Sequence, residues 1–163
     1  MKDKRNKVIF VCTGNICRSP MGEALLKEAI AKDGDAALSE LEVMSAGTST
    51  VDGMPPSANS AAALRRIDID ISDYRSTSLK QSDVDGAFAI FAMGQSHIDI
   101  MKLHYRNLPP RVFTVLQMVP SSRVKDVPDP YGGDLDEYLD TRDNIALTIP
   151  HILQYLKNEL KKS

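Results

Sequence analysis

Two uninterrupted apolar runs constrain the fold of this chain more than any other feature of its sequence. The first run, KVIFVC, occupies residues 7–12, and the second, AFAIFAM, occupies residues 87–93. Runs without alternating polar residues are typical of strands buried on both faces, and such strands occur in parallel sheets covered by helices. Each run is followed by a segment with helical spacing, at residues 20–33 and 96–105. The sequence therefore predicts an α/β fold whose parallel sheet carries helices on both faces.

The remaining segments continue the alternation of strands and helices. We predict further strands at residues 41–47 and 111–116, and further helices at residues 57–66 and from residue 135 to the end of the chain. Pro150 should kink or interrupt the last helix, because proline removes a backbone donor from the helix interior. Ligands of such folds bind at the carboxyl ends of the strands, in the loops that lead into helices.

Length, charge and cysteine content narrow the class of protein. The chain has 163 residues, which is the size of one domain, so we expect residues 1–163 to form a single domain. A formal net charge of -2 provides no basic field for nucleic acid. Two cysteines make no disulfide framework and suggest free thiols. No apolar run has the length of a signal-peptide core or a membrane span, so we expect a cytoplasmic protein without membrane insertion.

Both cysteines lie in one strand-to-helix turn, within the segment CTGNICRS at residues 12–19. A helix that begins after Ser19, its predicted N-cap, offers unpaired backbone N–H groups and a partial positive charge. Gly14 and Asn15 can adopt positive φ, so the loop can curl with its N–H groups pointing inward. Arg18 adds a fork of donors suited to two phosphate oxygens. We predict a phosphate-binding loop between the first strand and the first helix.

Cys12 lies where the first strand ends, and its sulfur should face the concave side of this loop. The donors that bind phosphate also favour a thiolate, which would be placed for in-line attack on a bound phosphoryl group. Alternatively, Cys12 is a small buried residue, or the two cysteines form a redox pair at a spacing unlike Cys-x-x-Cys. A metal site would need two more ligands, and a nucleotide-binding loop would need a Gly-Lys-Ser/Thr sequence that is absent.

The segment VCTGNICRSP resembles the active-site loop of the low molecular weight protein tyrosine phosphatases, and DPYGG at residues 129–133 matches the same family. The resemblance spans essentially the whole chain and implies a four-stranded parallel sheet with helices on both faces. It implies hydrolysis of phosphotyrosine and small aryl phosphates through a phosphocysteine, without metal or cofactor. A phosphotyrosine-containing protein is the expected partner, and we expect a monomer or a weak dimer. The phosphate-binding residues that it implies are Thr13, Gly14, Asn15, Ile16, Cys17, Arg18 and Ser19.

Attack by the cysteine requires a general acid on the opposite side of the phosphate. Three aspartates follow the fourth strand, at Asp126, Asp129 and Asp134. Asp134 is followed three residues later by Glu137, which is the pattern of a helix N-cap. Asp129 lies between two prolines and matches the Asp-Pro-Tyr of the family. The resemblance therefore assigns Asp129 as the general acid and base.

Supporting roles follow from the same comparison. Arg18 would hold the phosphate oxygens and stabilise the transition state. Ser19 could donate a hydrogen bond to the thiolate, while Asn15 and Ser45 could fix the shape of the loop. In the family the second cysteine can form a reversible disulfide with the first, which makes Cys17 a candidate redox partner. Alternatively, Cys17 is a small buried residue.

The pocket walls bear on the choice of substrate. Ile16 supplies an apolar wall and Tyr131 an aromatic one, which suits a phenyl ring. A phosphoguanidine would prefer a polar residue at position 16, as in related arginine phosphatases. We therefore favour phosphotyrosine, with an arginine phosphatase of the same family as the alternative. A catalytically idle phosphate-binding regulatory domain is a further alternative, but binding alone requires neither a thiolate nor an acid.

Two observations concern histidine. The segment ISDYRS, at residues 71–76, lacks a histidine that family members often carry there. We therefore expect part of the hydrogen-bond network that supports the loop to be weaker in this chain. The three histidines of this chain, His97, His104 and His151, fall in predicted helices. We interpret them as surface residues or as core residues with satisfied hydrogen bonds.

Overall fold

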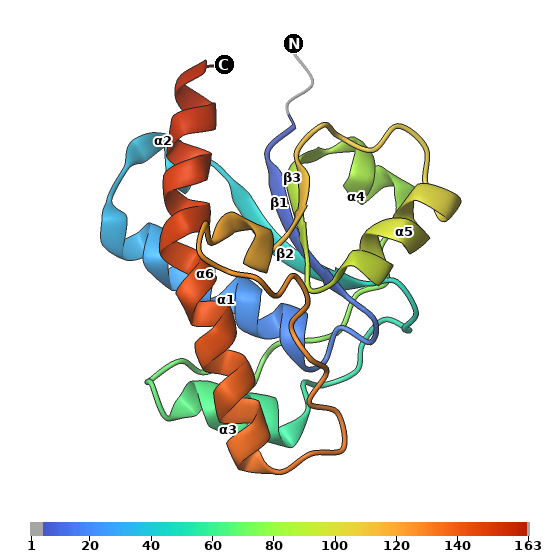
Figure 1. The fold of residues 1–163 in the computed structure, drawn as a ribbon, viewed down its shortest axis with the longest axis vertical. Helices are drawn as coiled ribbons and strands as arrows, with labels where there is room; N and C mark the ends of the chain where they lie inside the picture. Colours follow the sequence, from blue (N-terminus) through green and yellow to red (C-terminus); the bar gives the residue numbers. More distant parts are fainter. Residues whose placement is uncertain (1–4, 163) are drawn as a thin grey trace.

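The centre of the molecule is a four-stranded sheet in the order β2-β1-β3-β4, and all of its neighbouring strands are parallel (Figure 1). The computed structural model describes residues 5–162, and residues 1–4 and 163, which we expect to belong to the same domain, lie outside the described residues. The predicted strands are confirmed, although the fourth is shorter than expected. Their bounds are β1 Lys7–Cys12, β2 Glu42–Gly47, β3 Ala87–Ala92 and β4 Val112–Thr114.

Helices cover both faces of the sheet, as predicted. Helices α1 and α6 lie on one face, and α4 and α5 lie on the other (Figure 1). The predicted helices are confirmed within a few residues, and three short helical segments were not predicted. The bounds are α1 Arg18–Asp33, α2 Ala36–Ser39, α3 Ala58–Arg65, α4 Gln81–Asp85, α5 Gln95–His104, the 3-10 turn η1 Leu116–Met118 and α6 Leu135–Lys162.

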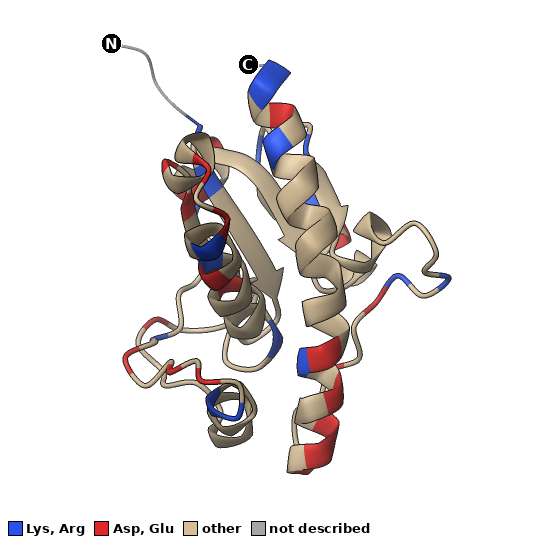
Figure 2. Cartoon of the chain, turned by 90° about the vertical axis from the view of Figure 1, so that its left-hand side faces the viewer, with Lys and Arg blue, Asp and Glu red and all other residues tan. Residues whose placement is uncertain are grey.

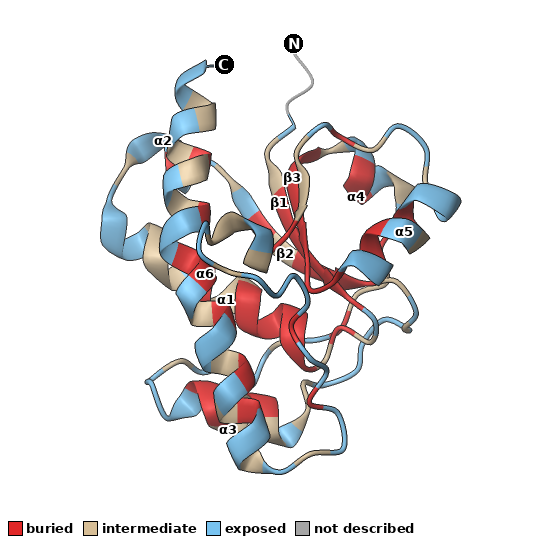
Figure 3. Ribbon diagram, in the orientation of Figure 1, coloured by how far each residue is buried: buried red, intermediate tan, exposed pale blue. Residues whose placement is uncertain are grey.

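The surroundings of β1 explain why apolar and polar residues do not alternate along its sequence. Val8 and Phe10 belong to the core on the side of α1 and α6, whereas Ile9 and Val11 belong to the core on the side of α5. These four side chains are completely buried, and Figure 3 shows buried residues along the strands and on the inner sides of the flanking helices. A strand that is covered on both sides gains from apolar residues at every position.

The strand order creates a crevice at the carboxyl ends of β1 and β3. The chain leaves β1 for α1 on one face of the sheet and leaves β3 for α5 on the opposite face. Two neighbouring strands whose connections diverge in this way form a ligand-binding crevice in open α/β sheets. The loop at residues 12–17 lies in this crevice, and the beginning of α5 lies beside it.

The predicted cap of α1 is wrong, and the interruption of α6 that Pro150 could have caused is not observed. Helix α1 begins at Arg18 and not after Ser19, and its N-cap is Cys17, without a capping side-chain hydrogen bond. The Ser19 hydroxyl is instead engaged by Cys12 and Asn15. Pro150 does not interrupt α6. It lies on the exposed side of the helix, where water can solvate the carbonyl that loses its partner.

Helix α6 begins with the capping box that the sequence predicts. The Asp134 carboxylate accepts from the Glu137 amide over 3.0 Å, and the Glu137 carboxylate accepts from the Asp134 amide over 3.4 Å. Figure 2 shows acidic residues gathered on the N-terminal part of α6, where they complement the helix dipole. Among residues 5–162, no helix combines the length and apolar character that crossing a membrane requires.

Candidate active site

The loop between β1 and α1 turns its carbonyl groups outward. Five of its carbonyls accept hydrogen bonds from other segments, each over 2.9 or 3.0 Å. A curled loop whose carbonyls bind the surrounding scaffold directs its N–H groups toward the inside, as an anion-binding nest does. The donor and acceptor pairs are Thr48 N to Cys12, Ser49 N to Thr13, Tyr74 Oη to Asn15, Ser57 N to Ile16 and Ser60 Oγ to Cys17.

Two backbone features allow this curl. Asn15 has a φ of 60°, in the left-handed region, as predicted, whereas Gly14 is not among the described residues with positive φ. Gly47, at the end of β2, lies against the loop, and a Cβ there would come within 2.6 Å of the Thr13 carbonyl oxygen. Any larger residue at this position would push the loop away from the sheet.

Arg18 carries a donor that the described residues do not satisfy. Its side chain is buried, Nη1 donates to the Val127 carbonyl over 2.9 Å, and Nη2 lies 3.6 Å from Asp129 Oδ2. Nε is buried, and among residues 5–162 no acceptor reaches it. A buried donor without an acceptor costs about 1–3 kcal/mol. Arg18 lines a cavity of about 220 Å³ together with the loop, so an anion bound there could supply the acceptor.

Cys12 lines the same cavity, and its sulfur makes two close polar contacts. It is 2.9 Å from Ser19 Oγ and accepts from the Asn15 amide over 3.3 Å. The side-chain amide of Asn15 donates one hydrogen to Ser19 Oγ and the other to Ser45 Oγ. Since Ser19 accepts from Asn15, its own hydrogen is free to point at the sulfur. This arrangement stabilises a negative charge on Cys12.

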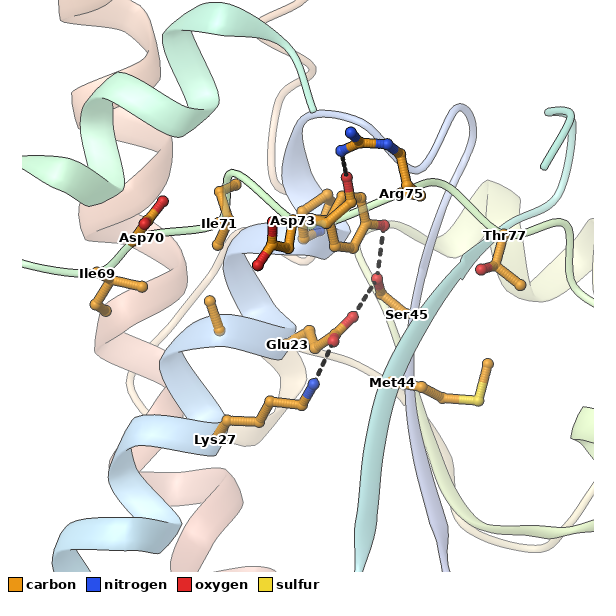
Figure 4. A pocket seen from close by; sticks show the side chains of 13 residues that line it. Glu23, Lys27, Met44, Ser45, Ile69, Asp70, Ile71, Asp73, Arg75 and Thr77 are labelled. Carbon is orange, nitrogen blue, oxygen red and sulfur yellow. Dashed lines mark hydrogen bonds and ion pairs between the residues drawn. The ribbon is translucent and has the colours of Figure 1, made fainter. Parts of the chain in front are cut away.

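The network continues behind the loop. Ser45 Oγ donates to Glu23 over 2.7 Å, and Glu23 forms an ion pair with Lys27 at 2.6 Å (Figure 4). These residues line a second cavity of about 540 Å³ between α1, β2 and residues 69–77. Because Glu23 accepts the Ser45 hydrogen, Ser45 must accept from Asn15. The carboxylate thereby fixes the direction of the hydrogen bonds that reach the nucleophile.

Tyr74 corrects the expectation that the missing histidine weakens this network. Its hydroxyl donates to the Asn15 carbonyl over 2.9 Å and lies 2.9 Å from Ser45 Oγ. Burial raises the pKa of Tyr74, so the hydroxyl keeps its hydrogen. A tyrosine thus supplies the support that the sequence comparison expected from histidine.

Asp129, Ile16 and Tyr131 line the cavity that contains Cys12 and Arg18. The Asp129 side chain is 51% exposed, and its Oδ1 accepts from the Tyr131 amide over 3.1 Å. The carboxylate is therefore open to solvent, and it belongs to the lining of the same cavity as Cys12. The structure brings the sequence-predicted nucleophile, arginine, aspartate and pocket walls together.

The other two aspartates have different partners. Asp126 accepts from the Gln95 amide over 2.9 Å, at the beginning of α5. Asp134 caps α6. Neither aspartate lines the cavity around the loop. The geometry therefore separates Asp129 from the two aspartates that were compared with it.

Cys17 is buried and free, like Cys12. Its sulfur lies 3.4 Å from the Tyr138 hydroxyl and 3.5 Å from Ser57 Oγ. Burial raises the pKa of Tyr138 to about 12, with a further contribution from its hydrogen bond to Cys17. The disulfide with Cys12 stays a prediction.

The sequence interpretation missed one residue beside the loop. His97 is buried, and its Nε2 lies 3.0 Å from Thr13 Oγ1, whereas its Nδ1 makes no hydrogen bond with the described residues. It is therefore not the fully satisfied core histidine that was expected. His104 and His151 are exposed, as expected. The position of His97 near the start of the helix after β3 indicates a contact with the loop only once β1 and β3 are known to be neighbours.

An α/β domain that presents a cysteine and an arginine on one curled loop, with five residues between them, has the construction of a cysteine-dependent phosphatase. The chain belongs to the low molecular weight phosphotyrosine protein phosphatase family, whose model matches residues 7–162. Within residues 5–162, no group of three or more His, Cys, Asp or Glu side chains is placed to hold a metal ion.

Individual relatives agree with this assignment. A protein-arginine-phosphatase of Geobacillus stearothermophilus is 33% identical over 153 residues, covering 94% of this chain and 97% of the relative. A low molecular weight protein-tyrosine-phosphatase, PtpA, of Staphylococcus saprophyticus is 37% identical over 125 residues, covering 76% and 77%. The solved structure of the low molecular weight protein tyrosine phosphatase from T. tengcongensis has a TM-score of 0.82 and 34% identity, covering 91% and 98%. The resemblance drawn from the loop sequence is confirmed.

Proposed function

We propose that this protein hydrolyses phosphotyrosine in proteins, and small aryl phosphates, through a phosphocysteine on Cys12. The observation that carries the proposal is the buried Arg18 Nε without an acceptor, on a residue that lines one cavity with Cys12 and Asp129. A phosphate in this cavity would meet the inward amides of the loop and the Arg18 fork, with its phosphorus above the sulfur. Membership of the family supports the same reaction class.

In the first step, the Cys12 thiolate attacks phosphorus and the bond from phosphorus to the tyrosyl oxygen breaks. Asp129, protonated, gives its proton to the departing oxygen, and its half-exposed position in the lining of the cavity supports this role. Arg18 and the loop amides stabilise the charge on the equatorial oxygens. The products of this step are the dephosphorylated tyrosine and a phosphocysteine.

In the second step, Asp129, now a carboxylate, takes a proton from water, and the water oxygen attacks phosphorus. The bond from phosphorus to sulfur breaks, and inorganic phosphate leaves. The Ser19 hydroxyl, 2.9 Å from the sulfur, stabilises the departing thiolate. Asn15 and Ser45 hold this hydroxyl in place through the hydrogen bonds described above.

We further propose a cytoplasmic setting and a phosphoprotein substrate. Both cysteines are free in the structure, and the mechanism needs a reduced nucleophile. The exposed Tyr131 ring at the rim, 74% exposed, offers an aromatic surface to a substrate that projects from another protein. A role for Cys17 in trapping oxidised Cys12 belongs to the same proposal.

Phosphoarginine is the second candidate substrate. Two relatives named protein-arginine-phosphatase are 33% and 34% identical and match 94% and 95% of this chain. The apolar Ile16 in the cavity wall favours a phenyl ring over a guanidinium, which would leave its donors unpaired against that wall. We therefore retain phosphotyrosine as the proposed substrate.

Peptides carrying phosphotyrosine or phosphoarginine test both candidates. With EDTA present, the wild type should hydrolyse the phosphotyrosine peptide with the higher kcat/KM. Ile16→Thr should lower kcat/KM for phosphotyrosine by about tenfold, because it removes apolar surface from the wall of the ring pocket. The measurement is phosphate release over a range of peptide concentrations.

Leu147→Thr is the matched control, because Leu147 is 65% exposed on α6 and lines none of the described cavities. Its kcat/KM should equal that of the wild type. A wild type that prefers phosphoarginine would establish the second candidate instead. A wild type that hydrolyses neither peptide, yet binds phosphate, would be the idle regulatory domain.

A further inference from the structure

His97 approaches the phosphate-binding loop from the opposite face of the sheet to α1. It lies on the first turn of α5, 84 residues from Thr13 in sequence, and its Nε2 is 3.0 Å from Thr13 Oγ1. The strand order explains this proximity, because β1 and β3 are neighbours and their carboxyl ends meet at the crevice. The imidazole is only 3% exposed, so the contact is part of the interior.

Thr13 differs from the rest of the loop in how its side chain is held. The loop carbonyls are bound by groups from the segment that follows β2, from the beginning of α3 and from Tyr74. His97 provides the one side-chain contact to Thr13 that the described residues show, and it comes from the side of β3. The loop is thus held from two directions: the Thr13 carbonyl accepts from the Ser49 amide, and the Thr13 side chain is held by His97.

Burial is the largest influence that favours a neutral His97 ring. Burial lowers the pKa of His97, and the Arg18 guanidinium lowers it further, whereas the Gly94 carbonyl, Asp126 and Asp129 act in the opposite direction. A neutral imidazole makes one contact as a donor and one as an acceptor. Only Nε2 makes a hydrogen bond here, so the ring acts on the loop through that atom.

We propose that His97 is a positioning residue for the phosphatase reaction, holding Thr13 so that the amides at the beginning of the loop converge on the phosphate. The inference rests on the proposed function. A displacement of the loop by a fraction of an ångström would weaken every amide contact to the phosphoryl group, and the transition state depends on these contacts most.

Substitutions at His97 separate positioning from packing. Glutamine can place a polar atom where Nε2 lies, whereas asparagine reaches only to the position of Nδ1, which has no partner. We expect His97→Ala and His97→Asn to lower kcat/KM for p-nitrophenyl phosphate by about tenfold. Both variants should also bind inorganic phosphate more weakly, with a higher Kd. His97→Gln should recover most of both losses. His104→Ala, on the same helix and exposed, should match the wild type.

A double-mutant cycle with Thr13→Val completes the test. Because His97 acts through Thr13, the double variant should lose no more activity than the more impaired single variant. Thermal unfolding of each variant shows whether it is folded, and the phosphate Kd still reports on the loop if the wild type proves inactive. Full activity in His97→Ala, equal rescue by asparagine and glutamine, or additive losses in the cycle would each overturn the inference.

Discussion

Cys12→Ser should abolish turnover of aryl phosphates while the protein stays folded and continues to bind phosphate. The hydroxyl fits where the sulfur accepts from the Asn15 amide and contacts Ser19, but a serine alcohol without an adjacent base is a poor nucleophile. We expect kcat to fall by a factor on the order of 10⁴ or more. The measurement is p-nitrophenol release, with unfolding and phosphate titration as checks on the fold and the loop.

Cys17→Ser is the matched control for this result. Cys17 lines the same cavity as Cys12, but its sulfur contacts Ser57 and Tyr138, and a hydroxyl can make both contacts. The variant should keep kcat within a few-fold of the wild type. Activity in Cys12→Ser comparable to that of Cys17→Ser would mean that the nucleophile is another group.

Asp129→Ala should have the second largest effect, and its size should depend on the leaving group. General acid catalysis contributes about 10²–10⁴ in rate, so kcat should fall within that range for phenyl phosphate or a phosphotyrosine peptide. The loss should be smaller for p-nitrophenyl phosphate, because its phenolate leaves more easily without a proton. Phosphate binding should persist, since the loop and Arg18 are unchanged.

Asp126→Ala distinguishes the acid from a general loss of negative charge nearby. Asp126 accepts from the Gln95 amide and lines no part of the cavity around the loop. Its removal should weaken the beginning of α5 and lower stability by about 1 kcal/mol. It should leave the dependence on the leaving group unchanged. If Asp129→Ala shows the same kcat for good and poor leaving groups as the wild type, Asp129 is not the acid.

The parts of this site that could be predicted from sequence are those encoded locally. The strand, the loop and the helix at residues 7–33 are contiguous, so their residue types report directly on an anion site. Asp129 and Ser45 were reached only through the resemblance, because nothing local links them to the loop. The structure then places Ser45 on the Asn15 amide and Asp129 in the cavity.

The parts that could not be predicted depend on distant contacts. Tyr74 lies in a segment without periodicity, and it supports the loop through Asn15, 59 residues away. The sequence around His97 is that of an ordinary helix, and its contact with the loop follows only from the fact that β1 and β3 are neighbours. The cap of α1 was mispredicted for a related reason, since the Ser19 hydroxyl is drawn into the loop by Asn15 and Cys12.

Alkylation by iodoacetate, with and without inorganic phosphate, addresses most directly whether the Cys12 sulfur lies at the base of a phosphate site. Peptide mapping by mass spectrometry would give separate rates for Cys12 and Cys17. The geometry predicts that Cys12 reacts faster than Cys17 and that phosphate slows the reaction of Cys12 more than that of Cys17. Equal rates for the two cysteines, or a Cys12 rate that phosphate does not change, would contradict the assignment.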